Sequence, residues 1–229
     1  MKAVILAAGE GRRMHPLTTS QPKPLLKIKG KAILEYIFEA LPAKVNEVYV
    51  VVRYLGDQIR QFLDGRFPDK KIYFVEGSDI GSAYSLLAVK PFIQEQESCM
   101  IINGDDLPTR QEANDCMGYS SCILVCESAE PESCGIVQLA KDGTISNILE
   151  KPPVPPSRSA VGGIIVVTGK IFSYKPIPST INGEFFVSSL LNQYLKEIPT
   201  YPVYTGACRQ FSSPADIDEI NKIIQQRQA

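Results

Sequence analysis

The chain has 229 residues, of which 44% are apolar and 21% charged, so it can bury a sizeable core as one α/β domain. Its 24 basic and 25 acidic residues leave a net charge of −1, which argues against a dedicated nucleic-acid-binding surface. No apolar run is long enough to span a membrane, and the N-terminal run is too short for a signal peptide. We therefore expect a cytoplasmic protein with no membrane partner.

The cysteines and the histidine argue against a structural metal. His15 is the sole histidine, and the six cysteines contain no CxxC pair, so a zinc site is not expected. Without an export signal, all six are expected to be free thiols. The cysteines are Cys99, Cys116, Cys122, Cys126, Cys134 and Cys208.

The first half of the chain predicts strands that alternate with helices. The run KAVILAA at 2–8 is continuously apolar and ends at Gly9 and Gly11, as buried parallel strands do. A helix is expected from Ile33 to a stop at Pro42, with further helices near 59–63 and 83–89. Strands are expected at 48–52, 72–75 and 99–102. Such alternation is typical of a wound parallel sheet.

The pattern changes in the second half. Strands are expected at 121–126, 135–139 and 145–149, the last two joined by the hairpin signal Asp142-Gly143. A proline-rich break at 151–156 precedes an apolar strand at 161–167, and helical spacing recurs at 185–195 and 214–224. The predicted fold is α/β: a three-layer, Rossmann-like wound sheet, mostly parallel, with a small antiparallel part that faces substrate.

The glycine-rich stretch after the first strand has the chemistry of a phosphate loop. In Gly9-Glu10-Gly11-Arg12-Arg13, the glycines let backbone N–H groups approach a phosphate, and arginine supplies charge. A Walker A loop is excluded because no lysine stands at the required place. A dinucleotide-binding GxGxxG is excluded because position 14 is Met14.

The longer motif is more specific. LAAGEGRRMHPLT at 6–18 and QPKPLL at 21–26 resemble the opening of the sugar-1-phosphate nucleotidyltransferases, whose pattern is roughly LAAGxGTRLxPLTxxxPKPLL. Arg12 departs from it, because the family has Thr or Ser there. GSA at 81–83, NGD at 103–105 and EKP at 150–152 resemble further segments of the family in the same order.

The resemblance implies transfer of a nucleotidyl group from an NTP to a sugar 1-phosphate, with in-line attack on the α-phosphorus and release of pyrophosphate. This chemistry needs positioning and charge neutralisation more than a nucleophile. The implied catalytic residues are Arg13 for the β/γ-phosphates, Lys23 between α-phosphate and acceptor phosphate, and Asp105. The implied nucleotide-binding residues are Leu6, Ala7, Ala8, Gly9, Gly11, Arg13, Glu76, Gly81 and Ser82.

The resemblance also divides a single domain, 1–229, into a nucleotide-binding part (1–120) and an acceptor-binding part (121–229). Glu150 and Lys151 would hold the acceptor's hydroxyls and phosphate, and Gly135 and Gly162 would let a sugar ring approach the backbone. Glu184 is a further candidate for facing the sugar. A homo-oligomer is left open.

Asp105 follows a buried strand, at the edge of the sheet where ligands bind. Magnesium takes one or two carboxylates together with phosphate oxygens and water, so Mg²⁺ is the expected cofactor, with Asp105 as its ligand and Asp106 assisting through water. The family's second ligand is an aspartate near the C-terminus, where this chain has Gln210. That difference indicates either a single-carboxylate site or impaired catalysis, and the first is favoured because Arg13, Lys23 and Asp105 are all retained. Asp216 is expected in the first turn of the last helix.

Two observations keep alternatives open. Glu76, as an acceptor of hydrogen bonds, suits guanine or cytosine, which favours GTP or CTP. Tyr84 begins a YSL stretch that resembles cytidylyltransferases acting on phosphocholine and similar phospho-alcohols, which generally lack EKP. A third alternative, suggested by Arg12 and Gln210, is a non-catalytic relative that binds nucleotide or nucleotide-sugar and regulates a partner.

Overall fold

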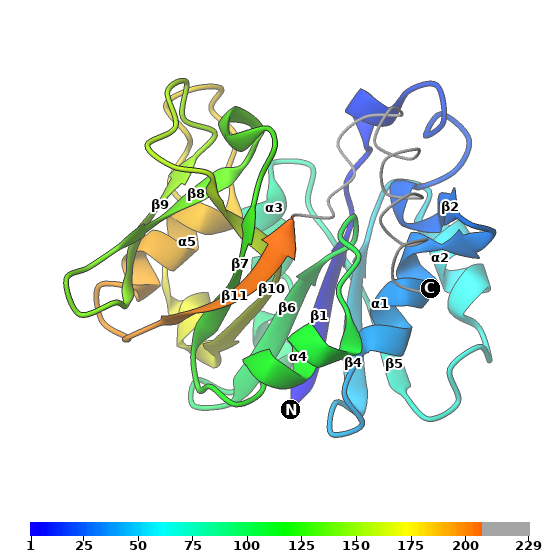
Figure 1. Cartoon of the computed structure of the whole chain (residues 1–229). Coiled ribbons are helices and arrows are strands. Elements are labelled where there is room, and N and C mark those ends of the chain that lie inside the picture. The colour runs from blue at the N-terminus through cyan, green and yellow to red at the C-terminus, as the bar shows by residue number, and fades with distance from the viewer. Residues whose placement is uncertain (208–229) are drawn as a thin grey trace.

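The computed structural model describes residues 1–207 and contains one large sheet (Figure 1). The strand order along the sheet is β11-β7-β10-β6-β1-β4-β5, with β8 attached to β10 and β9 to β8. The strands are β1 (Lys2–Ala7), β4 (Glu47–Val52), β5 (Lys71–Glu76), β6 (Ser98–Asn103), β7 (Cys122–Glu127), β8 (Gly135–Leu139), β9 (Ile145–Glu150), β10 (Ser159–Thr168) and β11 (Tyr201–Ala207). A short hairpin, β2 (Lys27–Ile28) with β3 (Lys31–Ala32), forms a separate sheet.

The predicted change of topology lies at β10. Strands β6, β1, β4 and β5 are parallel neighbours, which confirms the wound part of the sheet. Strand β10 then runs antiparallel between β6 and β7, and β8 and β9 form the antiparallel hairpin predicted at Asp142-Gly143. The fold is therefore the predicted mostly parallel α/β sheet with a small antiparallel part.

Helices cover both faces of the sheet and make three layers. On one face, α1 (Ile33–Ala40), α2 (Gly56–Leu63) and α4 (Arg110–Cys116) pack on alternate residues of β1 and β4, such as Ile5 and Val50. On the other face, α3 (Ser82–Leu87) and α5 (Val187–Tyr194) pack on the residues between them, such as Val4 and Val51. Because both faces are buried, the central strands are apolar throughout, as the sequence predicted.

The β2–β3 hairpin, α4 and β11 were not predicted from the sequence. Helix α4 has few apolar residues, but it has a capping box in which Glu112 N–H donates to Thr109 Oγ1 and Thr109 N–H donates to Glu112. The helix predicted at 214–224 lies outside the described residues.

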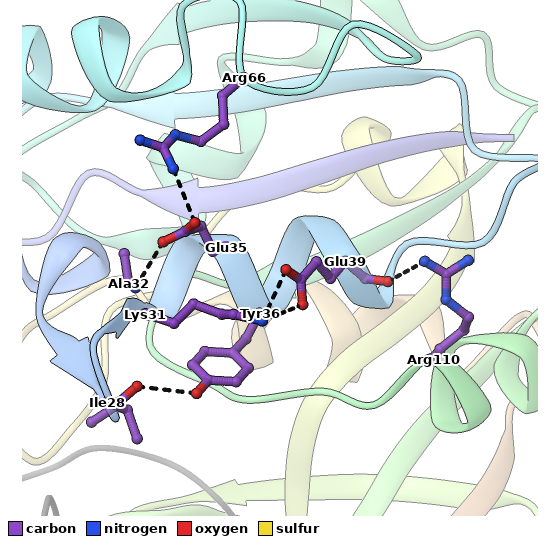
Figure 2. A network of polar contacts seen from close by, with 8 residues as sticks. All are labelled: Ile28, Lys31, Ala32, Glu35, Tyr36, Glu39, Arg66 and Arg110. Carbon is purple, nitrogen blue, oxygen red and sulfur yellow. Dashed lines mark hydrogen bonds and ion pairs between the residues drawn. The ribbon is translucent and has the colours of Figure 1, made fainter.

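A polar network fixes α1 to its neighbours (Figure 2). Glu35 accepts from the backbone N–H of Ala32 and from Arg66, so the first turn of the helix is capped. Tyr36 donates to the carbonyl of Ile28, which holds the β2–β3 hairpin on the helix. Because this hairpin directly follows residues 23–26, the network also fixes the segment that carries Lys23.

The expectation of free thiols holds for four cysteines and is wrong for Cys126. Cys99, Cys116, Cys122 and Cys134 are free. Cys126 is disulfide-bonded. Within residues 1–207, no helix is long and apolar enough to cross a membrane.

Cys99 on β6 gives a testable pH dependence. Its burial raises the pKa of the thiol to about 12 from a usual value of 9.0. The resulting stabilisation is complete below pH 9 and is lost as pH rises from 9 toward 12, because only the unfolded chain releases the proton in that range. Urea denaturation of wild type should lose about 1.4 kcal/mol per pH unit there through this group.

The Cys99→Ala variant should lack that contribution, whatever its stability at pH 8. Ser98→Ala, on the same strand, is the control and should parallel wild type. Equal pH slopes for Cys99→Ala and wild type would contradict the assignment.

Candidate functional site

The predicted phosphate loop lies where β1 meets β6. The loop begins after Ala7, and Gly11 adopts a left-handed conformation with φ of 66°. A Cβ on Gly11 would lie 3.2 Å from both Lys23 Cβ and Thr18 Cγ2, so glycine serves both the turn and the close packing. Thr18 donates to the Gly11 carbonyl at 2.8 Å and holds the loop closed.

Lys23 and Asp105 meet beside this loop. Lys23 Nζ lies 2.6 Å from Asp105 Oδ2, and the two side chains are 10% and 28% exposed. Gly104, just before Asp105, donates its N–H to the Leu6 carbonyl at 2.9 Å. A Cβ on Gly104 would lie 2.7 Å from that oxygen, so only glycine lets the end of β6 approach β1 this closely. Two predicted catalytic residues, 82 positions apart, are therefore in direct contact.

The two loop arginines differ. Arg12 Nε lies 2.7 Å from Glu10 Oε2, so its charge is paired. Arg13 is exposed and makes no ion pair within residues 1–207. Gly9 is exposed, and nothing would lie within 4 Å of a Cβ there. Within residues 1–207 the Arg13 guanidinium is therefore exposed and without an ion pair, which suits a loop that binds phosphate.

The remaining predicted nucleotide-binding residues lie on other elements. Glu76, at the end of β5, has a side chain that is 68% exposed and an oxygen 3.5 Å from Arg60 of α2. Gly81 directly precedes α3, and Ser82 begins it and contacts the start of α5: the N–H of Val187 donates to Ser82 Oγ at 3.2 Å. Gly81 packs against the Phe185 backbone. Glu76 thus stands apart from the Lys23–Asp105 pair, turned toward α2.

The predicted acceptor residues gather at the ends of β8 and β9. Ser188 Oγ donates to Glu150 Oε2 at 2.7 Å, and a Cβ on Gly135 would lie 3.5 Å from that same Glu150 oxygen. Lys151 Nζ lies 4.3 Å above the Phe186 ring. Gly162 instead packs against β7, where its Cβ would meet the Leu124 carbonyl at 3.0 Å, so its small size serves strand packing.

Cys134 links the acceptor residues to the end of β6. Burial raises the pKa of its thiol, and the carboxylates of Asp106 and Glu150 raise it further, whereas a hydrogen bond from Ser128 lowers it. Asp106 is buried and accepts from Asn103 Nδ2 at 3.1 Å. The raised pKa keeps this thiol neutral, so it is not a nucleophile at neutral pH.

The donor set fits magnesium better than a metal held by protein alone. Within the described part of the chain, no three His, Cys, Asp or Glu side chains are grouped to hold a metal ion. Asp105 offers a partly exposed carboxylate at the end of a strand. Mg²⁺ is commonly held by one or two carboxylates with phosphate and water, so Asp105 suits it. Gln210 and Asp216 lie outside the described residues.

Sequence reasoning missed the side chains that hold the acceptor residues. Phe186 and Ser188 belong to no motif of the resemblance, and they reach Lys151 and Glu150 across more than 30 residues of sequence. The paired aromatics Phe185 and Phe186 before an amphipathic helix were the visible signal. That signal indicates the position of the segment in the sequence, but it does not indicate that the segment contacts Glu150 and Lys151.

Comparison with known proteins gives concordant matches. A family model described as nucleotidyl transferase matches residues 2–203. The bifunctional protein GlmU of Methanocaldococcus jannaschii is 30% identical over 98% of this chain and 54% of its own length. A bifunctional sugar-1-phosphate nucleotidylyltransferase/acetyltransferase of Sulfurisphaera tokodaii is 26% identical over 97% of this chain and 55% of its own. The chain thus spans about half the length of the curated relatives it matches.

A solved structure has the same fold. It is described as a glucose-1-phosphate thymidylyltransferase from Bacillus anthracis in complex with a sucrose. Its TM-score is 0.82 at 22% identity, and the match covers 97% of this chain and 94% of the other. At that identity the likeness establishes the shared fold.

Gly163 gives a test of how the site is packed. A Cβ at this position on β10 would lie 2.4 Å from Asp106 Cβ, so Gly163→Ala must push β10 away from the end of β6. Overpacking of this kind costs about 1–3 kcal/mol, measured as unfolding free energy in urea. Gly9→Ala is the control, since its new methyl enters open space, and it should stay within about 0.5 kcal/mol of wild type. Equal stability of the two variants would contradict the described packing.

Proposed function

Because the chain belongs to the nucleotidyl transferase family, we propose that it transfers a nucleotidyl group from an NTP to a sugar 1-phosphate. An oxygen of the sugar phosphate attacks the α-phosphorus in line; the new P–O bond forms as the bond to the β-phosphate breaks, and pyrophosphate leaves. No covalent intermediate on the protein is involved. The Sulfurisphaera tokodaii relative is named for this class of reaction, which supports the assignment.

The observation that carries the proposal is the Lys23–Asp105 pair beside a loop whose Arg13 is exposed and makes no ion pair within residues 1–207. In-line phosphoryl chemistry depends on positioned charge near the phosphates. Lys23, a compact cation on a long stem, would bind the α-phosphate and the acceptor phosphate. Arg13 and the backbone of residues 9–11 would bind the β- and γ-phosphates. Asp105 would hold Mg²⁺, which supplies further neutralisation of phosphate charge when bound.

The base and the acceptor would lie on either side of this centre. Leu6, Ala7, Ala8, Gly81 and Ser82 would border the nucleoside, and Glu76 would read the base. The carboxylate of Glu76 is exposed and lies 3.5 Å from Arg60, so it can turn toward a base at little cost. On the other side, Glu150 would accept from sugar hydroxyls, Lys151 would bind the acceptor's phosphate, and Gly135 would border the ring.

A second candidate is a CTP-dependent cytidylyltransferase for phosphocholine or a related phospho-alcohol. A group of aromatic side chains favours this candidate. The ammonium of Lys151 lies over the Phe186 ring, and Tyr84 packs edge-on against Phe185. An aromatic face that accepts one ammonium can accept a quaternary ammonium group as well. Choice between the two candidates therefore depends on the acceptor.

Pyrophosphate release tests both candidates in one assay. Purified protein with Mg²⁺ is given each of five common NTPs and either a pool of sugar 1-phosphates or phosphocholine. Release that needs one NTP and a sugar 1-phosphate together is the expected result, and omission of Mg²⁺ should abolish it. Release only with CTP and phosphocholine would establish the second candidate. Nucleotide binding without release from any pair would favour a regulatory protein.

Arg13→Ala and Arg12→Ala form a matched pair for the same assay. Arg13 has no ion pair within residues 1–207, whereas Arg12 is paired with Glu10. Arg13→Ala should lower kcat/KM by about 100-fold or more, as removal of one charge-stabilising donor commonly does. Arg12→Ala should change it by less than about fivefold, the scale of an exposed ion pair. A larger loss in Arg12→Ala would mean that the wrong arginine has been assigned to the phosphates.

A further inference from the structure

Residues 185–188, at the start of α5, contact both halves of the site. We call them the α5 entry segment. None of them lies in the LAAGEGRRMHPLT, QPKPLL, GSA, NGD or EKP segments. Their contacts reach Glu150 and Lys151 on one side and residues 81–83 on the other. A role for them in acceptor recognition would rest on the proposed function.

Ser188 holds the Glu150 carboxylate. Its hydroxyl, on a residue that is only 8% exposed, donates to Glu150 Oε2 at 2.7 Å. Hydrogen bonds to a charged group are among the stronger ones in proteins, and this one fixes the orientation of the carboxylate. Within residues 1–207 the other Glu150 oxygen has no hydrogen-bond partner, so it can accept from an acceptor's hydroxyl groups.

Phe186 holds Lys151 in a different way. Lys151 makes no ion pair within residues 1–207, and its ammonium lies 4.3 Å above the ring. An aromatic face attracts the ammonium but leaves its charge intact. Lys151 is thus held in place while still able to attract a phosphate, unlike Lys23, whose charge is paired with Asp105.

The backbone of Lys151 explains how both side chains reach one segment. Successive residues of a strand point to opposite faces, so Glu150 and Lys151 would ordinarily diverge. Lys151 instead has φ of 45°, a left-handed conformation that is costly for a residue with a Cβ. Its N–H donates to the Cys134 carbonyl at 2.9 Å, which stabilises the turn. Strain of this kind is commonly found at binding sites.

The entry segment is also fixed to the nucleotide half. The N–H of Ala83 donates to the Phe185 carbonyl at 2.9 Å, and the N–H of Val187 donates to Ser82 Oγ at 3.2 Å. At Gly81 an added Cβ would come within 2.4 Å of the Phe185 carbonyl oxygen, so the two backbones are in direct contact. The side chains that hold Glu150 and Lys151 thus stand on a segment anchored beside the proposed nucleotide site.

We propose that the α5 entry segment is the positioning element for the acceptor: Ser188 orients Glu150 and Phe186 orients Lys151, so acceptor affinity depends on two residues that act through Glu150 and Lys151. Ser188 and Phe186 are positioning residues, because they act through Glu150 and Lys151. They determine how tightly the acceptor binds and leave NTP binding to residues 6–13 and 76–82.

Steady-state kinetics with both substrates varied tests the proposal. Ser188→Ala should raise the acceptor KM about tenfold or more, the effect of losing a hydrogen bond to a charged group, while the NTP KM stays within twofold. Phe186→Leu, which keeps apolar volume but lacks the ring, should raise the acceptor KM about threefold. Ser188→Thr retains the hydroxyl and should restore the wild-type acceptor KM.

Ser121→Ala is the matched control. Ser121 is also a buried serine with a side-chain hydrogen bond, to Thr200 at 2.8 Å, at the far end of β7. It should lower stability and leave both KM values unchanged. A double-mutant cycle of Ser188→Ala with Glu150→Gln, read as the urea midpoint, should give less than the sum of the single shifts.

The outcomes separate this inference from the proposed function. A wild-type protein that turns over no NTP and acceptor pair contradicts the proposed function, and the inference fails with it. An active wild type in which Ser188→Ala raises both KM values equally, or neither, overturns the inference alone. So do additive midpoints in the cycle, because the two side chains would then not interact.

Discussion

The ion pair between Lys23 and Asp105 is the constraint on which the site depends. A lysine as buried as this one is costly to keep charged unless a carboxylate meets it, so the segment that carries Lys23 and the end of β6 must stay together. Two glycines make the approach feasible: Gly11 gives room beside Lys23, and Gly104 lets β6 lie against the Leu6 carbonyl. The polar network around α1 also fixes the segment that carries Lys23, because Tyr36 holds the hairpin that follows it (Figure 2). The pair therefore joins the phosphate loop to the proposed metal ligand.

The three cationic side chains of the proposed site differ in how their charge is paired. Arg13 is exposed and has no ion pair within residues 1–207, Lys23 is neutralised by Asp105, and Lys151 rests on an aromatic ring. Each state suits the proposed role. Arg13 would bind the solvent-exposed phosphates of the NTP, and Lys151 would bind the phosphate of the acceptor. Lys23 would release the Asp105 carboxylate and bind phosphate oxygens instead as the substrates bind. The site thus holds its charges in position before any substrate is present.

The sequence predicted the parts that depend on local pattern. Strands β1, β4 and β6 are continuous apolar runs, and the Asp142-Gly143 turn gave the β8–β9 hairpin. Helix α4 was not predicted because its apolar face is short. Thr109 and Glu112 form a capping box, which is a sequence signal for the start of this helix. Strand β11 contains Pro202 and Gly206, which weaken a strand pattern, and within residues 1–207 it pairs with β7 alone. Contacts such as Ser188 with Glu150, and the disulfide of Cys126, depend on tertiary structure and have no local signal.

Turnover of the double variant Lys23→Met/Asp105→Leu tests most directly whether the ion pair is there for catalysis or for stability. Breaking a buried pair from one side costs about 3–5 kcal/mol, whereas replacing both partners with apolar side chains of similar size is often neutral. If the pair carries the chemistry, the double variant should unfold near the wild-type urea midpoint yet release pyrophosphate at least about 100-fold more slowly. A folded double variant that retains wild-type turnover would contradict the assignment of Lys23 and Asp105 to the reaction.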